Sequence, residues 1–465
     1  MARVVVGAAI APTEAAAVTP LQSRVLTATI VGSGMAFADG SIVTVAIPKM
    51  RVALDASLAE MQWVANGYTL VLSALLLLGG AAGDRYGLRR VYALGIALFA
   101  MASFACALSA DSTELILARA AQGFGAALMV PGSLALIAAH FPSDERGRAI
   151  GVWAATTSIA AAFGPLLGGW LIDHAPWQSI FLINLPFAAL GLGIVIRGVT
   201  DLPAGNATGM DWLGALLAVI GLGGVALSLT LVGEPGADAR RAAIASGAAG
   251  LAALAGFVAW ESRARAPMMP LRFFRDRRAN GVNILTLLLY FALSGAIFFL
   301  PSTLIQRDGW SAATAGSIFL GFTAMLAILS RFGGAIADRF GVRIPLTVGP
   351  AITAASFAAL APAVVVGDFW TAIEPTMLLM GVGMGITVAP LSTAVMASAP
   401  AGQTGVASAI NNAVARVAGL FAVASLGAIV GDRFGGFSAL ALICAAAAAA
   451  SAAVGFATLG NAQSE

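Results

Sequence analysis

The sequence predicts an all-α membrane protein of fourteen transmembrane helices, built as two six-helix pseudo-repeat bundles plus two inserted helices. Three observations lead to this prediction: the composition, fourteen apolar segments of membrane-crossing length, and two copies of one loop sequence. Of the 465 residues, 59% are hydrophobic and 10% are charged, and the mean hydropathy is +0.92. Soluble domains carry about 25% charged residues. A chain this poor in charge needs lipid as part of its solvent.

Each predicted span is a largely apolar segment of about 20 residues, the length that a helix needs to cross the hydrocarbon core. In chain order, the predicted spans are 24–48, 61–83, 91–110, 113–139, 148–172, 178–198, 211–232, 241–260, 280–305, 312–336, 343–366, 370–397, 403–429 and 437–459. The seventh and eighth are rich in glycine and alanine, and they flank a loop that contains Glu234, Pro235 and Asp238.

An internal repeat divides these spans into two sets of six. The segment GGAAGDRYGLRR begins at Gly79, and the similar segment GGAIADRFGVRI begins at Gly333. Further along, Gly123 corresponds to Gly381 in the second copy. Repeated halves that face each other across a central cavity are one arrangement of secondary transporters. The repeat therefore leaves the seventh and eighth spans as an insert between two bundles.

The predicted domains follow from the repeat. They are a cytoplasmic tail (1–23), an N-terminal six-helix bundle (24–198), a two-helix insert with a cytoplasmic loop (199–279), a C-terminal six-helix bundle (280–459) and a second cytoplasmic tail (460–465). The segments predicted to be cytoplasmic hold 16 arginine and lysine residues, against 6 in the outer loops. Because cytoplasmic loops carry the excess of basic residues, we expect a multi-pass protein of the cell inner (plasma) membrane with both termini in the cytoplasm.

The repeated loop motif follows the second span and is predicted to act as a cytoplasmic gate. Its members are Gly79, Gly83, Asp84, Arg85, Gly87, Arg89 and Arg90. Glycine permits close helix approach and a tight turn, and Asp84 is placed to pair with a basic group or a helix N-terminus. The alternative is a signal for topology and turning. The recurrence at Asp338 and Arg339 favours the gate.

Two charged residues inside spans are candidates for proton coupling. Asp39 lies well inside the first span, where an aspartate costs about 2.5–3.5 kcal/mol to insert and often marks a proton pathway. The alternative is a neutral or paired aspartate that only packs helices. Arg119 lies in the fourth span and shares a helix face with Gln122. Our hypothesis is that Arg119 pairs with Asp39 in one state and releases it in another.

The fifth span carries small residues at every fourth position. Ala160, Gly164 and Gly168 form one smooth face, and Pro165 and Gly169 stand beside it. Small residues let a neighbouring helix approach closely, and proline removes one backbone hydrogen bond and favours a kink. The pattern predicts a hinge, or a leak-proof contact between moving halves.

Together these motifs resemble the major facilitator superfamily, and the fourteen spans resemble its drug:proton antiporter-2 branch. The family's first-span motif is similar to ADGSIVTVAIP from Ala38 to Pro48, and its loop motif to GGAAGDRYGLRR. Its fourth-span motif matches Arg119, Gln122 and Gly123, and its fifth-span motif is similar to the glycine face, with Ala160 in place of the first glycine. The fifth-span motif is associated with antiporters rather than with uptake symporters.

This resemblance implies a proton-coupled secondary transporter that exports hydrophobic or cationic small molecules by alternating access. The alternatives are a dedicated exporter of one metabolite or antibiotic, and a membrane sensor, scaffold or enzyme of a different class. We expect no enzymatic activity, no cofactor beyond the proton gradient, no metal site and no nucleic-acid partner. The expected partners are a small-molecule substrate, protons and the lipid bilayer, and the expected oligomeric state is a monomer.

The central cavity is expected to be lined by polar and aromatic residues from several spans, although ordinary packing is the alternative for each. The candidates are Trp63, Tyr68, Gln122, Tyr290, Phe291, Met384, Glu374, Asn411, Asn412 and Arg416.

Overall fold

The computed structural model describes residues 19–200, 209–265, 267–399, 404–430 and 436–459. Helices dominate this part of the chain, and fourteen of its helical segments are long and apolar enough to cross a membrane. The predicted all-α membrane fold with fourteen spans is therefore confirmed. The two terminal tails lie largely outside the described residues.

The N-terminal lobe comprises the first six spans, the sixth being formed by α6 and α7 together. Its helices are α1 (Pro20–Ala53), α2 (Leu58–Tyr86), α3 (Leu88–Leu108), α4 (Ser112–His140), α5 (Ser143–His174), α6 (Ser179–Leu182) and α7 (Asn184–Gly198). The C-terminal lobe comprises the last six. Its helices are α10 (Arg277–Asp308), α11 (Ala312–Phe340), α12 (Pro345–Val366), η2 (Phe369–Ile373), α13 (Glu374–Ala397), α14 (Thr404–Val430) and α15 (Gly436–Thr458).

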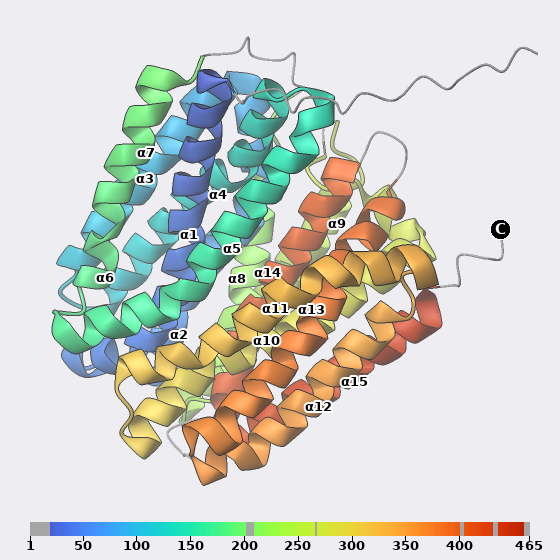
Figure 1. The fold of residues 1–465 in the computed structure, drawn as a ribbon. Helices are drawn as coiled ribbons and strands as arrows, with labels where there is room; N and C mark the ends of the chain where they lie inside the picture. The colour runs from blue at the N-terminus through green and yellow to red at the C-terminus, as the bar shows by residue number, and fades with distance from the viewer. Residues whose placement is uncertain (1–18, 201–208, 266, 400–403, 431–435, 460–465) are drawn as a thin grey trace, which may run out of the picture.

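The two lobes repeat the same helix neighbours. In the N-terminal lobe α2 packs on α4 and α1 packs on α5, and in the C-terminal lobe α11 packs on α13 and α10 packs on α14. Figure 1 shows the lobes as two inclined bundles, one blue to green and the other yellow to red. They meet where α5 packs on α11, α2 on α14 and α1 on α10. The sequence repeat is thus a structural repeat.

The insert, α8 (Trp212–Leu231) and α9 (Ala237–Glu261), is a closely packed helix pair. Glycines form its seam: a Cβ on Gly224 would lie 2.8 Å from the Cα of Gly250. α8 also packs on α2 of one lobe and on α14 of the other. After α9 in the chain, the 3₁₀ helix η1 (Leu271–Arg275) leads into α10. The insert therefore flanks the contact between the lobes.

Several helices extend beyond the apolar segments that predict them, because capping groups at their ends satisfy backbone donors. α1 begins at Pro20 instead of 24, since Thr19 and Gln22 form a capping box. α10 begins at Arg277 instead of 280, since Asp276 accepts from the amide of Ala279. The predicted starts of both bundles are wrong by these few residues.

Candidate functional site

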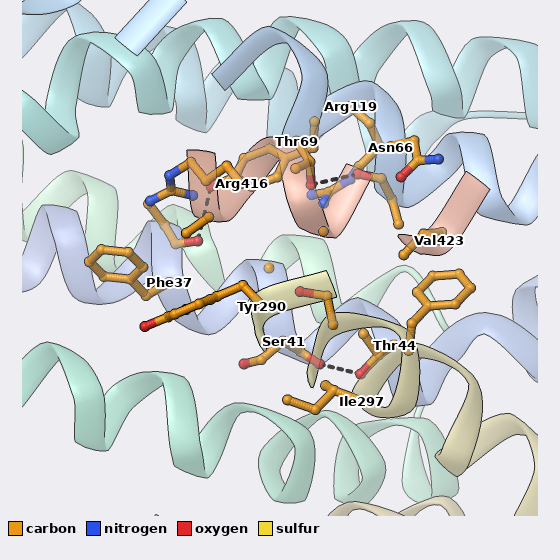
Figure 2. Close-up of a pocket in the computed structure, with 18 of the residues that line it drawn as sticks. Phe37, Ser41, Thr44, Asn66, Thr69, Arg119, Tyr290, Ile297, Arg416 and Val423 are labelled. Carbon is orange, nitrogen blue, oxygen red and sulfur yellow. Dashed lines mark hydrogen bonds between the residues drawn. The ribbon is translucent and has the colours of Figure 1, made fainter. Parts of the chain in front are cut away.

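A cavity of about 450 Å³ lies between the lobes, lined by residues of α1, α2, α4, α10 and α14 (Figure 2). Five of the residues selected from the sequence line it: Tyr68, Arg119, Tyr290, Asn412 and Arg416. They come from helices of both lobes, so the cavity spans the contact that alternating access would rearrange.

The other cavity candidates lie elsewhere. Trp63 and Phe291 pack in apolar clusters, and Met384 is 2% exposed in the core. Asn411 lines a smaller adjoining pocket that shares Tyr290 and Asn412 with the central cavity, and its amide donates to Asn283 and Thr286 of α10. Glu374 lies beside Gly321, at the packing of α13 on α11. None of these five residues is in the described lining of this cavity. Trp63, Phe291 and Asn411 stand on helices that line it, whereas Met384 and Glu374 stand on α13, which contributes no residue to the described lining.

Asp39 and Arg119 form a buried ion pair beside the cavity. Arg119 Nη1 donates to Asp39 Oδ2, and each side chain is 1% exposed. The pairing put forward as a hypothesis from the sequence is therefore present in this conformation. Taking two charges out of water is costly unless they are paired and hydrogen-bonded, so the surrounding groups decide whether this pair is tolerated.

The polar groups around the pair come from three further places in the chain. Gln122 Nε2 donates to Asp39 Oδ1 at 2.9 Å, and Asn184 Nδ2 donates to the same oxygen at 2.8 Å. Asn184 also donates to Ser103 Oγ at 2.9 Å. Gln122, Asn184 and Ser103 are at most 3% exposed. Gln122 thus belongs to this network and does not line the cavity.

Sequence reasoning missed Asn184 and Ser103. Neither carries a charge or belongs to a motif, and Asn184 stands at the junction of α6 and α7. The available signal was a polar residue in the middle of an otherwise apolar span, which usually has a structural or functional partner.

Arg119 is the member of the network that also reaches the cavity. Its Nε donates to the carbonyl of Val64 at 3.1 Å, and its guanidinium lies 4.5 Å from the ring centre of Tyr68. Both Arg119 and Tyr68 line the cavity, whereas Asp39 does not. Arg119 therefore connects Asp39 with the cavity, so a molecule bound in the cavity and the charge on Asp39 influence each other through this guanidinium.

The glycine face of α5 packs differently from its prediction. A Cβ on Gly164 would lie 2.0 Å from Ser41 Oγ, and one on Gly168 would lie 2.8 Å from Ile42 Cγ2. Ala160 likewise faces Gly34. All three neighbours belong to α1, so this face closes a seam inside the N-terminal lobe. The expectation that it forms the contact between the halves is wrong.

Pro165 and Gly169, beside this face, make the contact of α5 with α11 of the other lobe. A Cβ on Gly169 would lie 2.3 Å from the carbonyl oxygen of Ala312, and a Cβ on Gly316 would lie 2.2 Å from that of Pro165. The backbones of α5 and α11 thus touch directly. At the same end, the Asp173 carboxylate accepts from the amides of Ala312 (3.1 Å) and Ala313 (2.9 Å).

Asp173 therefore caps α11 across the lobes. The first amides of a helix have no partner within the helix and attract negative charge. The carboxylate at the end of α5 satisfies two of these amides in α11. Sequence analysis missed Asp173, because a carboxylate at a predicted loop is an ordinary feature until its distant partner is known.

The loop motif lies at the opposite end of the molecule. Gly79 lets α2 approach α4, since a Cβ there would lie 2.0 Å from the carbonyl oxygen of Ala127. Gly87 joins α2 to α3 with a φ of 97°. Arg89 donates to the carbonyls of Val195 (3.2 Å) and Ile196 (2.6 Å), at the end of α7. These contacts give the motif a role in joining helices of one lobe.

Asp84 has no ion pair or hydrogen bond within the described residues, and its side chain is exposed. It lines a second cavity, of about 1130 Å³, together with Arg265, Arg272 and Arg275. Arg85, Arg90 and Arg339 are exposed as well, while the side chain of Asp338 lies outside the described part. Asp84 thus makes no gate contact with the described residues in this conformation, whereas Asp173 at the other end joins the two lobes.

Membrane-length helices in two repeated lobes around a central cavity define a multi-pass membrane protein of the transporter class. The chain belongs to the Major Facilitator Superfamily, whose family model matches residues 29–423. The fourteen spans agree with the fourteen-span branch named above.

Curated relatives cover most of the chain. It is 36% identical over 410 residues to the methylenomycin A resistance protein of Bacillus subtilis (strain 168), covering 87% of each chain. It is 34% identical over 419 residues to the tetracenomycin C resistance and export protein of Streptomyces glaucescens, covering 88% of this chain and 76% of the relative.

A solved structure of a D-xylose-proton symporter has the same fold. It gives a TM-score of 0.67 at 16% identity, with 96% of this chain and 100% of that chain covered.

Proposed function

We propose that the protein is a proton-coupled secondary transporter that exports a hydrophobic small molecule by alternating access. The observation that carries this proposal is that Arg119 both pairs with Asp39 and lines the central cavity. Relatives described as resistance and export proteins support the direction of transport. The proposed energy source is the proton gradient, without a cofactor, and the proposed functional unit is the monomer.

The distribution of basic residues supports a location in the plasma membrane, with both termini of the chain on the cytoplasmic side. In that orientation, Asp173 and Gly169 lie at the outer end, where the lobes are packed together. The larger cavity beside Asp84 then faces the cytoplasm. The conformation described is accordingly inward-facing, ready to take a substrate from inside the cell.

Protonation of Asp39 is proposed to change the cavity through Arg119. An ionised Asp39 neutralises Arg119, and a protonated Asp39 leaves that guanidinium without its counter-charge. A proton on Asp39 and a substrate in the cavity both act on Arg119. Each therefore changes the binding affinity of the other by the same factor. One proton moving through 100 mV provides about 2.3 kcal/mol, and one pH unit adds about 1.4 kcal/mol. This is enough to drive the export of a neutral compound.

The test uses cells and everted vesicles with fluorescent dyes of neutral, anionic and cationic charge. Wild-type protein should extrude at least one dye against its gradient, and an uncoupler should stop it. Asp39→Asn should abolish uphill extrusion while facilitated equilibration of the dye remains. Glu374→Gln is a matched control, because it neutralises another acid within a span but outside the network. Undiminished uncoupler-sensitive extrusion by Asp39→Asn would refute the role of Asp39.

A dedicated exporter of one compound is the second candidate. It is favoured by relatives whose descriptions each give one antibiotic. Deletion of the gene distinguishes the two: a dedicated exporter leaves drug tolerance unchanged across a panel and causes one compound to accumulate in the cell.

A further inference from the structure

Arg416 brings a second positive charge to the central cavity. It stands on α14 and lines the cavity, with its guanidinium 5.7 Å from the ring centre of Phe37 (Figure 2). Unlike Arg119, it has no acidic partner or hydrogen bond within the part of the chain that the structure describes. Its Nε is buried and unsatisfied. A guanidinium nitrogen that is buried without a partner is costly unless a ligand or water accepts its hydrogen bond.

The cavity wall offers further donors and no acid. Asn66 is 1% exposed and lines the cavity, and its Nδ2 has no hydrogen-bond partner. None of the described residues that line the cavity is an aspartate or a glutamate. With Asp39 ionised and paired to Arg119, Arg416 alone gives the cavity a positive charge; with Asp39 protonated, that charge increases. A cation is therefore repelled in either state.

Aromatic side chains provide the remaining recognition surface. Phe37, Tyr68 and Tyr290 line the same cavity, and Figure 2 shows Arg416 above Phe37 at one end of it. Ring faces of this kind pack on flat ring systems, while the planar guanidinium of Arg416 presents several donors to oxygen acceptors. The two features lie close enough to contact one compound together.

We propose that this cavity binds a flat aromatic compound through an oxygen acceptor, either a carboxylate or phenolate or a neutral carbonyl, and that Arg416 holds this oxygen. The proposal rests on the proposed function, of which it names the substrate class. It replaces the cationic part of the sequence-based expectation, since no carboxylate among the described lining residues is present to receive an amine.

The test measures binding to the purified full-length protein in nanodiscs with three fluorescent anthracene probes. The probes share one ring system and differ only in one group: anthracene-2-carboxylate, 2-acetylanthracene and anthracen-2-ylmethylammonium. We expect wild-type protein to bind the carboxylate, the ketone or both more tightly than the ammonium. Tight binding of the carboxylate alone indicates an anionic substrate, and comparable binding of the ketone indicates a neutral acceptor.

Two substitutions of Arg416 separate charge from packing. Arg416→Gln should weaken the preferred acceptor probe about 10- to 100-fold, the loss expected for a hydrogen bond to a charged donor. The affinity of this variant for the ammonium probe should equal or exceed that of the wild type. Arg416→Lys keeps the charge and should retain most carboxylate binding, and it remains informative if the glutamine variant does not fold.

The proposal is overturned if the ammonium probe binds wild-type protein as tightly as the acceptor probes, or if none of the three binds. It is also overturned if Arg416→Gln leaves the acceptor affinities unchanged. Vesicle transport separates this result from the proposed function. Uphill extrusion of the ammonium probe, unaffected by Arg416→Gln, would leave proton-coupled export standing and remove only the substrate class. If the protein binds the acceptor probes but transports no dye uphill, the substrate class stands and proton-coupled export is refuted.

Discussion

The hydroxyl of Ser41 on α1 lies 2.8 Å from the carbonyl oxygen of Ala161 on α5 and can donate to it. Four residues after Ala161 stands Pro165, which has no amide hydrogen to donate back to that carbonyl. Ser41 thus supplies a donor where the helix lacks one, and Gly164 leaves the room for it. Because Ser41 follows Asp39 by two positions, this contact joins the helix that carries Asp39 to α5, which packs on the other lobe.

The first prediction concerns Gly164. A Cβ there would lie 2.0 Å from Ser41 Oγ, so Gly164→Ala should destabilise the protein by about 1–3 kcal/mol, the usual cost of overpacking. Ser41→Ala should reduce this cost, because it removes the hydroxyl that the new methyl group meets. Thermal unfolding of both single variants and the double variant in detergent gives the coupling energy.

Gly151→Ala is the matched control for this cycle. Gly151 lies on the same helix, and a Cβ there would meet nothing within 4 Å. Its melting temperature should equal or slightly exceed that of the wild type, because alanine is favoured over glycine inside a helix. Strictly additive effects of Gly164→Ala and Ser41→Ala would show that the two residues do not act on each other.

The second prediction concerns the contact of Asp173 with the start of α11. Asp173→Ala removes a cap worth about 1 kcal/mol, and the population with this end closed should fall about fivefold relative to the open one. Spin labels at the exposed positions His174 and Thr314 would report the change as longer distances. The native cysteines, Cys106 and Cys444, are buried and should not take up the label.

Gly169→Ala should act in the same direction, because its methyl group would lie 2.3 Å from the backbone oxygen of Ala312. Gly334→Ala on α11 provides the control, since a Cβ there meets nothing within 4 Å. A distance distribution that stays at its wild-type form in both Asp173→Ala and Gly169→Ala would contradict the assignment of a closed end.

The third prediction concerns Asn184. Asn184→Leu removes one of the donors to Asp39 Oδ1 and leaves Gln122 as the other. The buried carboxylate then loses a hydrogen bond to a charged acceptor, which is worth about 1.5–3 kcal/mol, so the protein should melt at a lower temperature and uphill efflux should fall. Thermal unfolding in detergent and efflux rates in everted vesicles check this outcome.

Asn184→Asp replaces an amide donor to Asp39 with a second carboxylate and serves as the opposing variant. It should impair transport more severely than Asn184→Leu. Wild-type stability and wild-type efflux in Asn184→Leu would show that this hydrogen bond to Asp39 contributes to neither.

The fourth prediction concerns Gly87 in the loop motif. Its φ of 97° lies in a region that side chains rarely adopt, so Gly87→Ala should cost about 1–3 kcal/mol. The melting temperature should fall accordingly. Gly147→Ala, at a helical position with open space around it, should keep the melting temperature or raise it slightly. An unchanged melting temperature in Gly87→Ala would mean that the turn adapts without strain.

The site was predictable from the sequence where a residue type is costly in lipid. Asp39 and Arg119 are such residues, and each needs a partner, so their pairing could be put forward before any coordinates. Asn184 and Ser103 could not be found in this way, because an uncharged polar side chain is tolerated in many spans. Glu374 and Asn411 show the converse: they stood out by type, but their side chains turn to α11 and α10 and not into the central cavity.

The sequence by itself determined the membrane class, the fourteen spans and the two repeated halves, because the length and period of apolar segments are local properties of the chain. Only the tertiary structure decided which neighbour each face meets. The glycine face of α5 meets α1 within one lobe, and the lobes touch through Pro165, Gly169 and Asp173. The physical reason is that a helix fixes the spacing of its side chains, whereas its rotation toward a partner depends on packing across the whole molecule.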